Sequence, residues 1–195
     1  MVIATIKKEP STGRLKAEKE DGSSFFIPLK LCFSMHLHEG MEMDEELYSK
    51  LHHASLSEQC YSKALELLAS QEHTRLLLSD KLVRKGFPRE IVNEQLQALI
   101  EEGSLDEGRY ARAFIESRLR RKIEGRTMMA ARLAAKGVDS AIAAQALDEA
   151  YSPDSVDLML GSLVGDSADS PELRAMLAKR GFTSYEIARH LRSRA

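Results

Sequence analysis

Leu82-Val83-Arg84-Lys85-Gly86-Phe87 is the stretch that decides the fold, because its pattern occurs twice more. The copies are Leu133-Ala134-Ala135-Lys136-Gly137-Val138 and Leu177-Ala178-Lys179-Arg180-Gly181-Phe182. In each copy a leucine, two variable residues and a base precede the glycine, and an apolar residue follows it. An apolar residue also lies eight positions before each glycine, and a leucine lies ten positions after it. Repetition of this kind is typical of proteins built from small units arranged in a row.

Gly86, Gly137 and Gly181 are predicted to be structural turn residues that each end a helix. Glycine adopts the left-handed conformation found after many helix ends without the steric cost of a Cβ atom. In such an ending the apolar residue after the glycine packs against the leucine of the last turn, and the preceding base suits the negative end of the helix dipole. The predicted contact pairs are Leu82 with Phe87, Leu133 with Val138, and Leu177 with Phe182.

A second helix is predicted after each glycine, and a leading helix before each repeated segment. Pro88, Asp139 and the capping box Thr183-Ser184-Tyr185-Glu186 mark the starts of the second helices. The leading helices are predicted over three ranges: 57–69, 106–122 and 156–164. Gly161 and Gly165 weaken the last of these. Glycine spacings of 51 and 44 residues suit three-helix units joined by short loops. Chance likeness among amphipathic helices is the alternative.

The first 55 residues differ in kind from the rest. Three short strands are predicted, over Val2–Lys8, Arg14–Glu20 and Ser24–Leu29. The turn-forming segments Pro10–Gly13 and Asp21–Gly22 separate them. A short helix is predicted over Asp44–His52, with acidic residues at its positive end.

These elements together predict a mainly all-α fold. It consists of tandem three-helix repeats in an elongated curved array, preceded by a small N-terminal antiparallel β-hairpin or sheet region. The expected domains are an N-terminal extension over 1–55, a first repeat over 56–103, a basic second repeat over 104–151 and a third repeat over 152–195.

Composition narrows the class of protein. The chain has 195 residues, 43% of them hydrophobic, so it can bury several cores. We expect neither a membrane span nor a signal peptide, because no apolar run is long enough and the start lacks an apolar stretch. Cys32 and Cys60 are the two cysteines, so disulfides are not expected and a cytoplasmic location is predicted.

The formal charge of −2 conceals a segregation of charge along the chain. The segment 109–136 carries nine bases against Glu116 and Glu124, a net charge of +7. The segment 139–171 carries seven acids and no Lys or Arg, and 172–195 returns to +4. Blocks of alternating sign along a row of repeats favour a partner with a matching pattern.

No catalytic or metal-binding constellation is evident in the sequence. Cys32, His36 and His38 do not have the spacing of a zinc site. Gly103 and Gly108 flank a helix start without the lysine that a phosphate-binding loop requires. A nucleophile, base and orienting group are not recognisable as a set. We therefore expect a binding protein that is not an enzyme, with no cofactor and no metal.

The basic segment contains the candidate binding residues. Arg109, Arg112, Glu116 and Arg120 recur on one face of the predicted helix, and arginine outnumbers lysine, which favours bidentate contact with carboxylates or phosphates. A merely solvated basic face is the alternative. The partner-binding residues are predicted to be Arg109, Arg112, Arg118, Arg120, Arg121, Lys122, Arg126, Arg132, Lys136, Arg189 and Arg192. Aromatic side chains are expected in core or cap contacts: Phe87, Phe182 and Tyr185.

Several of these segments resemble the bacterial regulatory protein family RecX. They are Leu82-x-x-Lys85-Gly86-Phe87, Leu105-Asp106-Glu107-Gly108-Arg109-Tyr110-Ala111, Arg118-Leu119-Arg120-Arg121-Lys122 and Leu133-x-x-Lys136-Gly137-Val138. The resemblance covers about residues 57–195 and is most specific between Lys81 and Ala150. Two departures stand out: the predicted helix at 156–164 lies in an acidic segment, and Gly108 occupies a place where family members often carry a larger residue.

The resemblance implies a fold of three-helix repeats in a row and a regulatory activity. Members of this family modulate, usually inhibit, the recombinase RecA by lying along the groove of its filament on single-stranded DNA. The implied effects are on ATP turnover, strand exchange and stimulated repressor self-cleavage in recombination and SOS repair. The implied partner is the RecA filament, with single-stranded DNA reached through it, and the chain is expected to be monomeric.

Arg109, Arg112 and Arg120 are the residues expected to meet acidic filament surface or DNA phosphate, while the third repeat touches the next subunit. A direct nucleic-acid binder is the main alternative, since capped three-helix units also build helix-turn-helix proteins. A helical scaffold for other proteins is a third reading, which the basic stripe disfavours.

Overall fold

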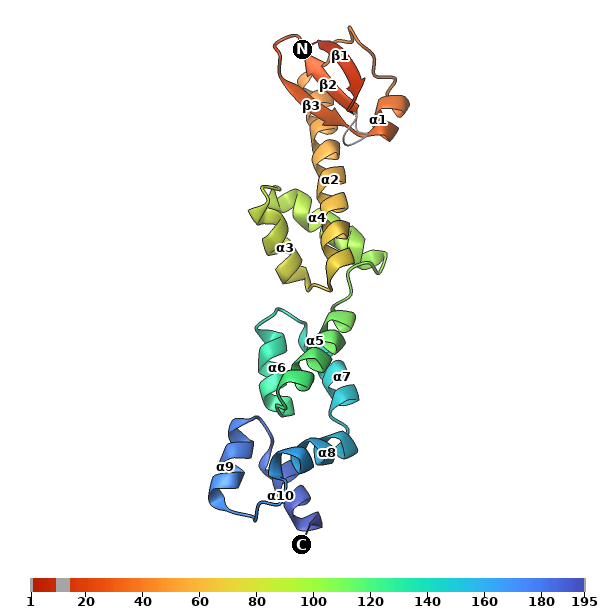
Figure 1. Ribbon diagram of the computed structural model, residues 1–195. Helices are drawn as coiled ribbons and strands as arrows, with labels where there is room; N and C mark the ends of the chain where they lie inside the picture. Colours follow the sequence, from red (N-terminus) through yellow and green to blue (C-terminus); the bar gives the residue numbers. More distant parts are fainter. Residues whose placement is uncertain (1, 10–14, 195) are drawn as a thin grey trace. The chain divides into compact units, whose positions relative to one another are not determined.

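The computed structural model describes residues 2–9 and 15–194, and contains ten helices and three strands over them (Figure 1). The chain forms two compact units. One comprises Met1–Ala69 with Ser79–Glu102, and the other comprises Ser70–Leu78 with Gly103–Ala195. None of the helices in the described part is both long enough and apolar enough to cross a membrane.

The N-terminal sheet is antiparallel in the order β1-β2-β3, with β1 at Ile3–Lys8, β2 at Leu15–Lys19 and β3 at Ser24–Ile27. This confirms the predicted small sheet. Ala17 pairs with Ile6 on one side and Phe25 on the other, and it is fully buried. The predicted turn at Pro10–Gly13, like the start of the second strand at Arg14, lies outside the described residues.

The third strand ends two residues earlier than predicted, because Pro28 starts the short helix α1 at Leu29–Ser34. The sequence did not predict this helix. Proline lacks the backbone N–H that a continuing strand would use, and its fixed φ suits a helix start.

Helix α2 runs without interruption over Glu45–Ser70. The prediction of two helices, over 44–52 and 57–69, is therefore wrong. No glycine or proline interrupts 45–70, and Ser55 is buried inside the helix, where its Oγ and carbonyl accept hydrogen bonds from Gln59. The first half of α2 covers the sheet, with Leu51 in that core and the ring of Tyr48 5.3 Å from that of Phe25.

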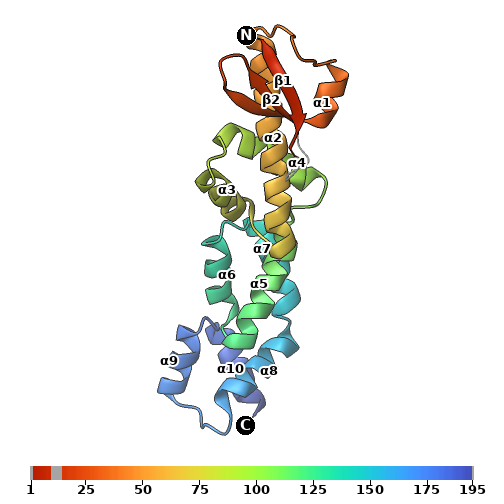
Figure 2. The same ribbon diagram turned by 45° about the horizontal axis from the view of Figure 1, so that its top comes forward.

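Eight further helices follow α2, in an order that groups into three-helix repeats. They are α3 at Arg75–Arg84, α4 at Arg89–Glu101, α5 at Glu107–Arg121, α6 at Arg126–Ala134, α7 at Ser140–Ala150, α8 at Pro153–Val164, α9 at Pro171–Lys179 and α10 at Ser184–Ser193. Repeat 1 is the second half of α2 with α3 and α4, repeat 2 is α5–α7 and repeat 3 is α8–α10. Figures 1 and 2 show α4 beside α2. The exact domain boundaries stay a prediction.

Side-chain caps start most of the helices where the sequence places them. Asp106 and Asp139 accept hydrogen bonds from backbone N–H groups of α5 and α7, and Thr183 forms a complete capping box with Glu186. Helix α8 starts three residues earlier than predicted, because Ser152 caps it and Pro153 occupies its first turn.

The three repeated glycines adopt the left-handed conformation, with φ of +94°, +77° and +94° at Gly86, Gly137 and Gly181. In each turn the backbone N–H of the residue after the glycine donates a hydrogen bond to the backbone carbonyl of the leucine five positions earlier, over 3.2–3.3 Å. This is the hydrogen bond of a Schellman ending, and a Cβ at these positive φ values would be strained.

Two of the three glycine turns dock onto the start of the middle helix of the preceding repeat. We call each of these contacts a joint. At the first joint, between the Gly137 turn and the start of α3, Thr74 Oγ1 donates a 2.7 Å hydrogen bond to the carbonyl of Lys136. A Cβ on Gly137 would come within 2.7 Å of Leu76. The turn of repeat 2 therefore contacts the first turn of α3 directly.

The second joint is closer still. The backbone N–H of Gly125 donates to the carbonyl of Arg180 over 2.8 Å, and that of Thr127 donates to Gly181 over 3.2 Å. A Cβ on Gly125 would lie 2.3 Å from the backbone of Gly181, so only glycine fits this approach. Repeats 2 and 3 share one hydrophobic core, which includes Leu133 and Leu177.

Candidate functional site

The basic segment lies mainly on α5 and α6, and the local sequence explains its placement. Asp106 caps α5 by accepting hydrogen bonds from Gly108 and Arg109, over 2.7 and 3.0 Å. The helix then runs to Arg121, while Ala111 and Ile115 fix its buried face. Helix α5 packs against α7, and so does α6. The arginines of α5 thus start from one rigid element.

Arg109, which is predicted to contact the partner, makes contacts within the protein. Its guanidinium donates to the carbonyls of Gly103 and Ser104 over 3.0 and 2.9 Å. Its Nε pairs with Glu72 at 2.9 Å, and Asp106 lies 3.5 Å away. These contacts occupy three of its nitrogen atoms, so the structure uses this side chain to hold the loop before α5.

Glu124 is the centre of the largest charge cluster in repeat 2. Its side chain is only 3% exposed, and Arg132 holds both carboxylate oxygens at 2.7 and 2.9 Å. Arg118 contributes two longer contacts of 3.3 Å, and Lys122 lies 3.8 Å away. We call Glu124, Arg118 and Arg132 the inner cluster. Two of the predicted binding arginines therefore face a buried carboxylate.

Electrostatics keep the Glu124 carboxyl ionised. Burial raises its pKa, but the hydrogen bonds and charges of Arg132 and Arg118 outweigh burial and bring the pKa below its usual value. The backbone carbonyl of Glu124 also accepts a 2.8 Å hydrogen bond from the hydroxyl of Tyr151, whose pKa burial raises well above its usual range. The cluster thus ties the α5–α6 loop to the end of α7.

Acidic residues on α7 pair with further predicted binding residues. Arg126 lies 2.6 Å from Asp148, and Arg112 lies 4.0 Å from Glu149. Arg112 and Glu149 stand at a pocket of about 420 Å³ whose walls include Ile115. The acidic end of α7 therefore balances part of the positive charge that the sequence shows on the preceding helices.

Arg189 and Arg192, the C-terminal members of the predicted set, also make contacts within the protein. Arg189 donates to the carbonyl of Pro153 over 2.8 Å and pairs with Asp157 at 2.9 Å, which joins α10 to α8. Arg192 donates to the carbonyl of Ala188 in its own helix over 3.1 Å. The backbone carbonyl of Lys136 accepts the hydrogen bond of Thr74 at the first joint. These contacts of Arg189 and Arg192 are thus with residues of α8 and α10.

The end of α5 carries two exposed arginines. Arg120 is 75% exposed, and its ion pair in the described part of the chain is with Glu116, one turn earlier on the same helix. Arg121 is exposed and has no ionic partner among residues 2–9 and 15–194. We call Arg120 and Arg121 the outer edge. These two side chains can reach a carboxylate or phosphate of a partner without breaking a contact between helices.

The inner cluster is a feature that the sequence does not predict. In the sequence, Glu124 is one of two acids among nine bases, and Tyr151 has no pattern that marks it as a partner of this loop. One signal was available, because a single acid in the loop between two basic helices is well placed to pair with both. The burial of that acid depends on tertiary packing and leaves no local pattern.

Over the described residues, no group of three His, Cys, Asp or Glu side chains gathers as a metal ion would require. Cys32 makes a 3.9 Å contact with the carbonyl of Leu37, and His38 contacts the carbonyl of Glu39 at 2.9 Å. The two side chains thus serve local backbone contacts.

Comparison with known families matches two segments of the chain. Residues 60–99 match the model described as the first three-helix domain of RecX, and residues 106–147 match that of the second three-helix domain. The second match contains the whole of α5 with both the inner cluster and the outer edge.

Individual relatives show the same likeness over most of their length. The regulatory protein RecX of Halorhodospira halophila is 34% identical over 142 residues, covering 67% of this chain and 85% of the relative. That of Pseudomonas entomophila is 33% identical over 138 residues, covering 67% and 88%.

Two solved structures share the fold. A crystal structure described as regulatory protein RecX aligns over 97% of this chain and 98% of its own with a TM-score of 0.78, at 20% identity. RecX from Lactobacillus salivarius aligns over 72% of this chain and 97% of its own with a TM-score of 0.62, at 22% identity. At these identities the likeness establishes the tandem helical fold.

Proposed function

Because the chain belongs to the RecX family of regulatory proteins, we propose that it binds the RecA filament on single-stranded DNA and inhibits RecA. The activities affected are ATP hydrolysis, strand exchange and stimulated repressor cleavage in recombination and SOS repair. The chain acts as a cytoplasmic monomer and by binding alone, without a catalytic step or a cofactor.

The observation that carries the proposal is the position of the outer edge. Arg120 and Arg121 end α5, inside the segment that matches the second RecX domain. They are the exposed arginines of that helix whose contacts do not join it to another element. A RecA filament offers carboxylates on its protein surface and phosphates on its DNA, and the planar guanidinium suits both.

The contact residues proposed here differ from those expected from the helical stripe. Arg120 and Arg121 are the main contacts, and Arg112 assists, since its 4.0 Å pairing with Glu149 is loose. Arg109 is left out because its guanidinium holds the loop at 103–104. Modest contacts suffice if several repeats engage neighbouring subunits, since each later contact forms at high effective concentration.

Direct DNA binding is disfavoured by the helix that would read the groove. In a three-helix unit of the helix-turn-helix type, the helix after the turn enters the major groove. In repeat 2 that helix is α7, which carries Asp148 and Glu149 and no base. Phosphate repulsion at this helix opposes binding.

The test is single-stranded-DNA-dependent ATP hydrolysis by RecA, measured with and without the protein. We expect hydrolysis to fall as the protein is added, to a plateau at a fixed ratio of protein to RecA. Unchanged hydrolysis at excess protein contradicts the proposal. Tight binding to DNA without RecA, falling steeply with salt, would instead support the nucleic-acid binder.

A further inference from the structure

The glycine turn of repeat 1 lacks the contact that the other two turns make. A Cβ on Gly137 or Gly181 would come within 2.7 or 2.6 Å of the helix on which that turn docks. A Cβ on Gly86 would meet nothing within 4 Å in the part of the chain that the structure describes, although the backbone of its turn also has a positive φ. The chain therefore contains one further copy of a turn that serves elsewhere as a docking element.

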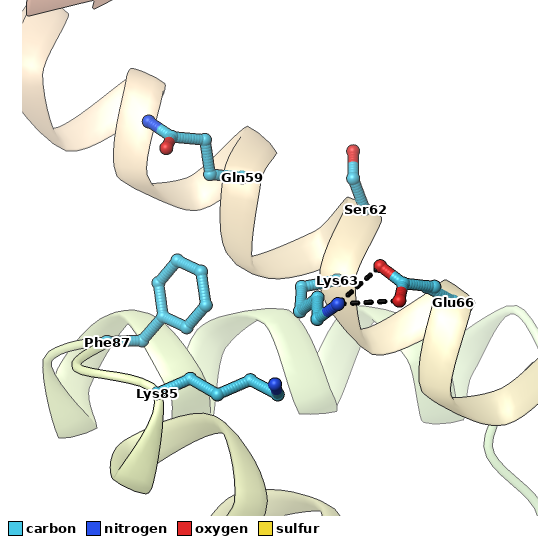
Figure 3. A pocket seen from close by; sticks show the side chains of 6 residues that line it. All are labelled: Gln59, Ser62, Lys63, Glu66, Lys85 and Phe87. Carbon is cyan, nitrogen blue, oxygen red and sulfur yellow. Dashed lines mark hydrogen bonds and ion pairs between the residues drawn. The ribbon is translucent and has the colours of Figure 1, made fainter. Parts of the chain in front are cut away.

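The apolar residue of this turn is left partly uncovered. Val138 and Phe182, the equivalents in repeats 2 and 3, are 6% and 3% exposed. Phe87 is only half-buried and forms a wall of an open pocket of about 430 Å³ between the turn and α2. Figure 3 shows this pocket, with Lys85 and Phe87 contributed by the turn and the remaining walls by α2. Covering Phe87 would remove apolar surface from water.

Two exposed bases beside the pocket suit an acidic group on the partner. On the α2 side, Lys63 Nζ is held by Glu66 at 2.5–2.6 Å, so its charge is already balanced. The Glu66 carboxylate in the wall is likewise neutralised by this pair, so the two side chains add no net charge. Arg84 and Lys85 are exposed, without an ion pair in the described parts of the chain. They suit an acidic residue beside the docking segment.

We propose that the Gly86 turn is a second docking point of this chain, which receives the N-terminus of a helix on a RecA protomer. The inference rests on the proposed function, since it takes the RecA filament as the partner. The two internal joints define what the partner must present. In each, a group at the helix start donates to a carbonyl of the turn, Thr74 Oγ1 in one and the Gly125 N–H in the other.

The same joints define the apolar part of the partner segment. Leu76 and Met128 pack on the glycine of the turn, two and three residues after the helix cap. The docking segment therefore has a small or hydroxyl-bearing residue at its cap and an apolar residue two or three positions later. An acidic residue next to the cap would pair with Arg84 or Lys85.

Site-specific photo-crosslinking tests this contact in the full-length protein. The photoreactive residue replaces Phe87 (Phe87→p-benzoylphenylalanine), and the control carries it at Tyr185, an exposed aromatic of repeat 3. We expect the Phe87 probe to form an adduct with RecA only when filaments on single-stranded DNA are present, at a peptide that begins a RecA helix. An adduct with DNA, with a second copy of this chain, or with none of these overturns the proposal.

A charge variant provides a measurement that leaves Phe87 unchanged. The change Arg84→Glu/Lys85→Glu reverses two exposed charges, and circular dichroism checks the fold. We expect filament affinity to fall about tenfold, corresponding to about 1.4 kcal/mol. The matched control is Lys7→Glu/Lys8→Glu on β1, which has the same charge change and should bind as the unmodified protein does.

The outcomes separate the two proposals. If the unmodified protein does not bind the filament, the proposed function fails. If it binds, and Arg84→Glu/Lys85→Glu binds equally well, only the docking role of the Gly86 turn is overturned.

Discussion

The inner cluster and the outer edge of repeat 2 differ in what their arginines do. Arg118 and Arg132 hold the buried Glu124, whereas Arg120 and Arg121, on the same helix as Arg118, face outward. All four side chains are chemically identical, and Arg118, Arg120 and Arg121 lie within three positions of one another on α5. The surroundings decide the role: burial of a carboxylate turns the first pair into structural residues.

This comparison corrects what the net charge suggests. The segment 109–136 has a charge of +7 by sequence, which favours a wholly basic binding face. In the structure, Glu124 neutralises part of that charge from within, and Asp148 and Glu149 of α7 balance more of it. The exposed arginines of α5 whose ion pairs do not reach another element in the described part of the chain are Arg120 and Arg121, at the end of that helix.

Of the changes near the inner cluster, Gly125→Ala should lower the free energy of unfolding the most. Gly125 is the neighbour of Glu124 in the sequence. The new Cβ would lie 2.3 Å from the backbone of Gly181, so repeats 2 and 3 must separate or shift. We expect the free energy of unfolding to fall by about 3 kcal/mol, near the upper end for overpacked sites. Urea titration followed by circular dichroism measures it.

Gly161→Ala is the matched control, since a Cβ there would lie 3.8 Å from His190, an ordinary contact, and Gly161 is inside α8. It should stabilise the protein, by about 0.5–1 kcal/mol, through helix propensity. Equal losses for both variants would mean that the close approach at Gly125 is not restrictive.

Glu124→Gln should have the next largest effect. It removes the charge that Arg132 and Arg118 share and leaves two guanidinium groups beside a neutral amide. We expect a loss of about 2 kcal/mol in the free energy of unfolding, in the range for hydrogen bonds to charged groups. Glu116→Gln is the matched change, because Glu116 pairs with Arg120 of the outer edge. It should leave the free energy of unfolding unchanged, since this pair is exposed.

The pH dependence of the inner cluster follows from the lowered pKa of Glu124. A carboxyl whose pKa is lower in the folded state stabilises the protein above its unfolded pKa, near 4.5, and loses this contribution as the pH falls through the folded value. The stability difference between the unmodified protein and Glu124→Gln should therefore be constant above about pH 5 and shrink below pH 4.5. A difference that grows on acidification would contradict this sign.

Charge reversal at the outer edge should have the smallest effect on stability. Arg120→Glu/Arg121→Glu changes two exposed side chains that form no ion pair with another helix over the described ranges. We expect the urea midpoint to stay within error of that of the unmodified protein. A clear loss of stability would show that the edge is structural, and the distinction from the inner cluster would fail.

The local elements of the fold were predictable because their signals are short-range. The glycine turns depend on a glycine and the apolar residue after it, and the caps at Asp106, Asp139 and Thr183 depend on one or two side chains. By contrast, the continuity of α2 through Ser55 was missed, because burial of that serine depends on the packing of the whole unit.

The candidate site was predictable in composition but not in orientation. The sequence places Arg109 and Arg120 on one stripe, and helical geometry supports that placement. Their roles differ because Arg109 finds the carbonyls of Gly103 and Ser104 and the carboxylate of Glu72, thirty-seven residues away in the sequence. Contacts of such separation have no signature in helical periodicity. The full set of partner-binding residues stays a prediction.

The affinity of Arg120→Glu/Arg121→Glu for RecA filaments on single-stranded DNA is the most direct measurement of the central claim. Lys7→Glu/Lys8→Glu on β1 is the control, because it changes the net charge equally. At one fixed salt concentration, we predict that the outer-edge variant binds at least about tenfold more weakly than the control, equivalent to about 1.4 kcal/mol. Equal affinities of the two variants would contradict the claim that the end of α5 contacts the filament.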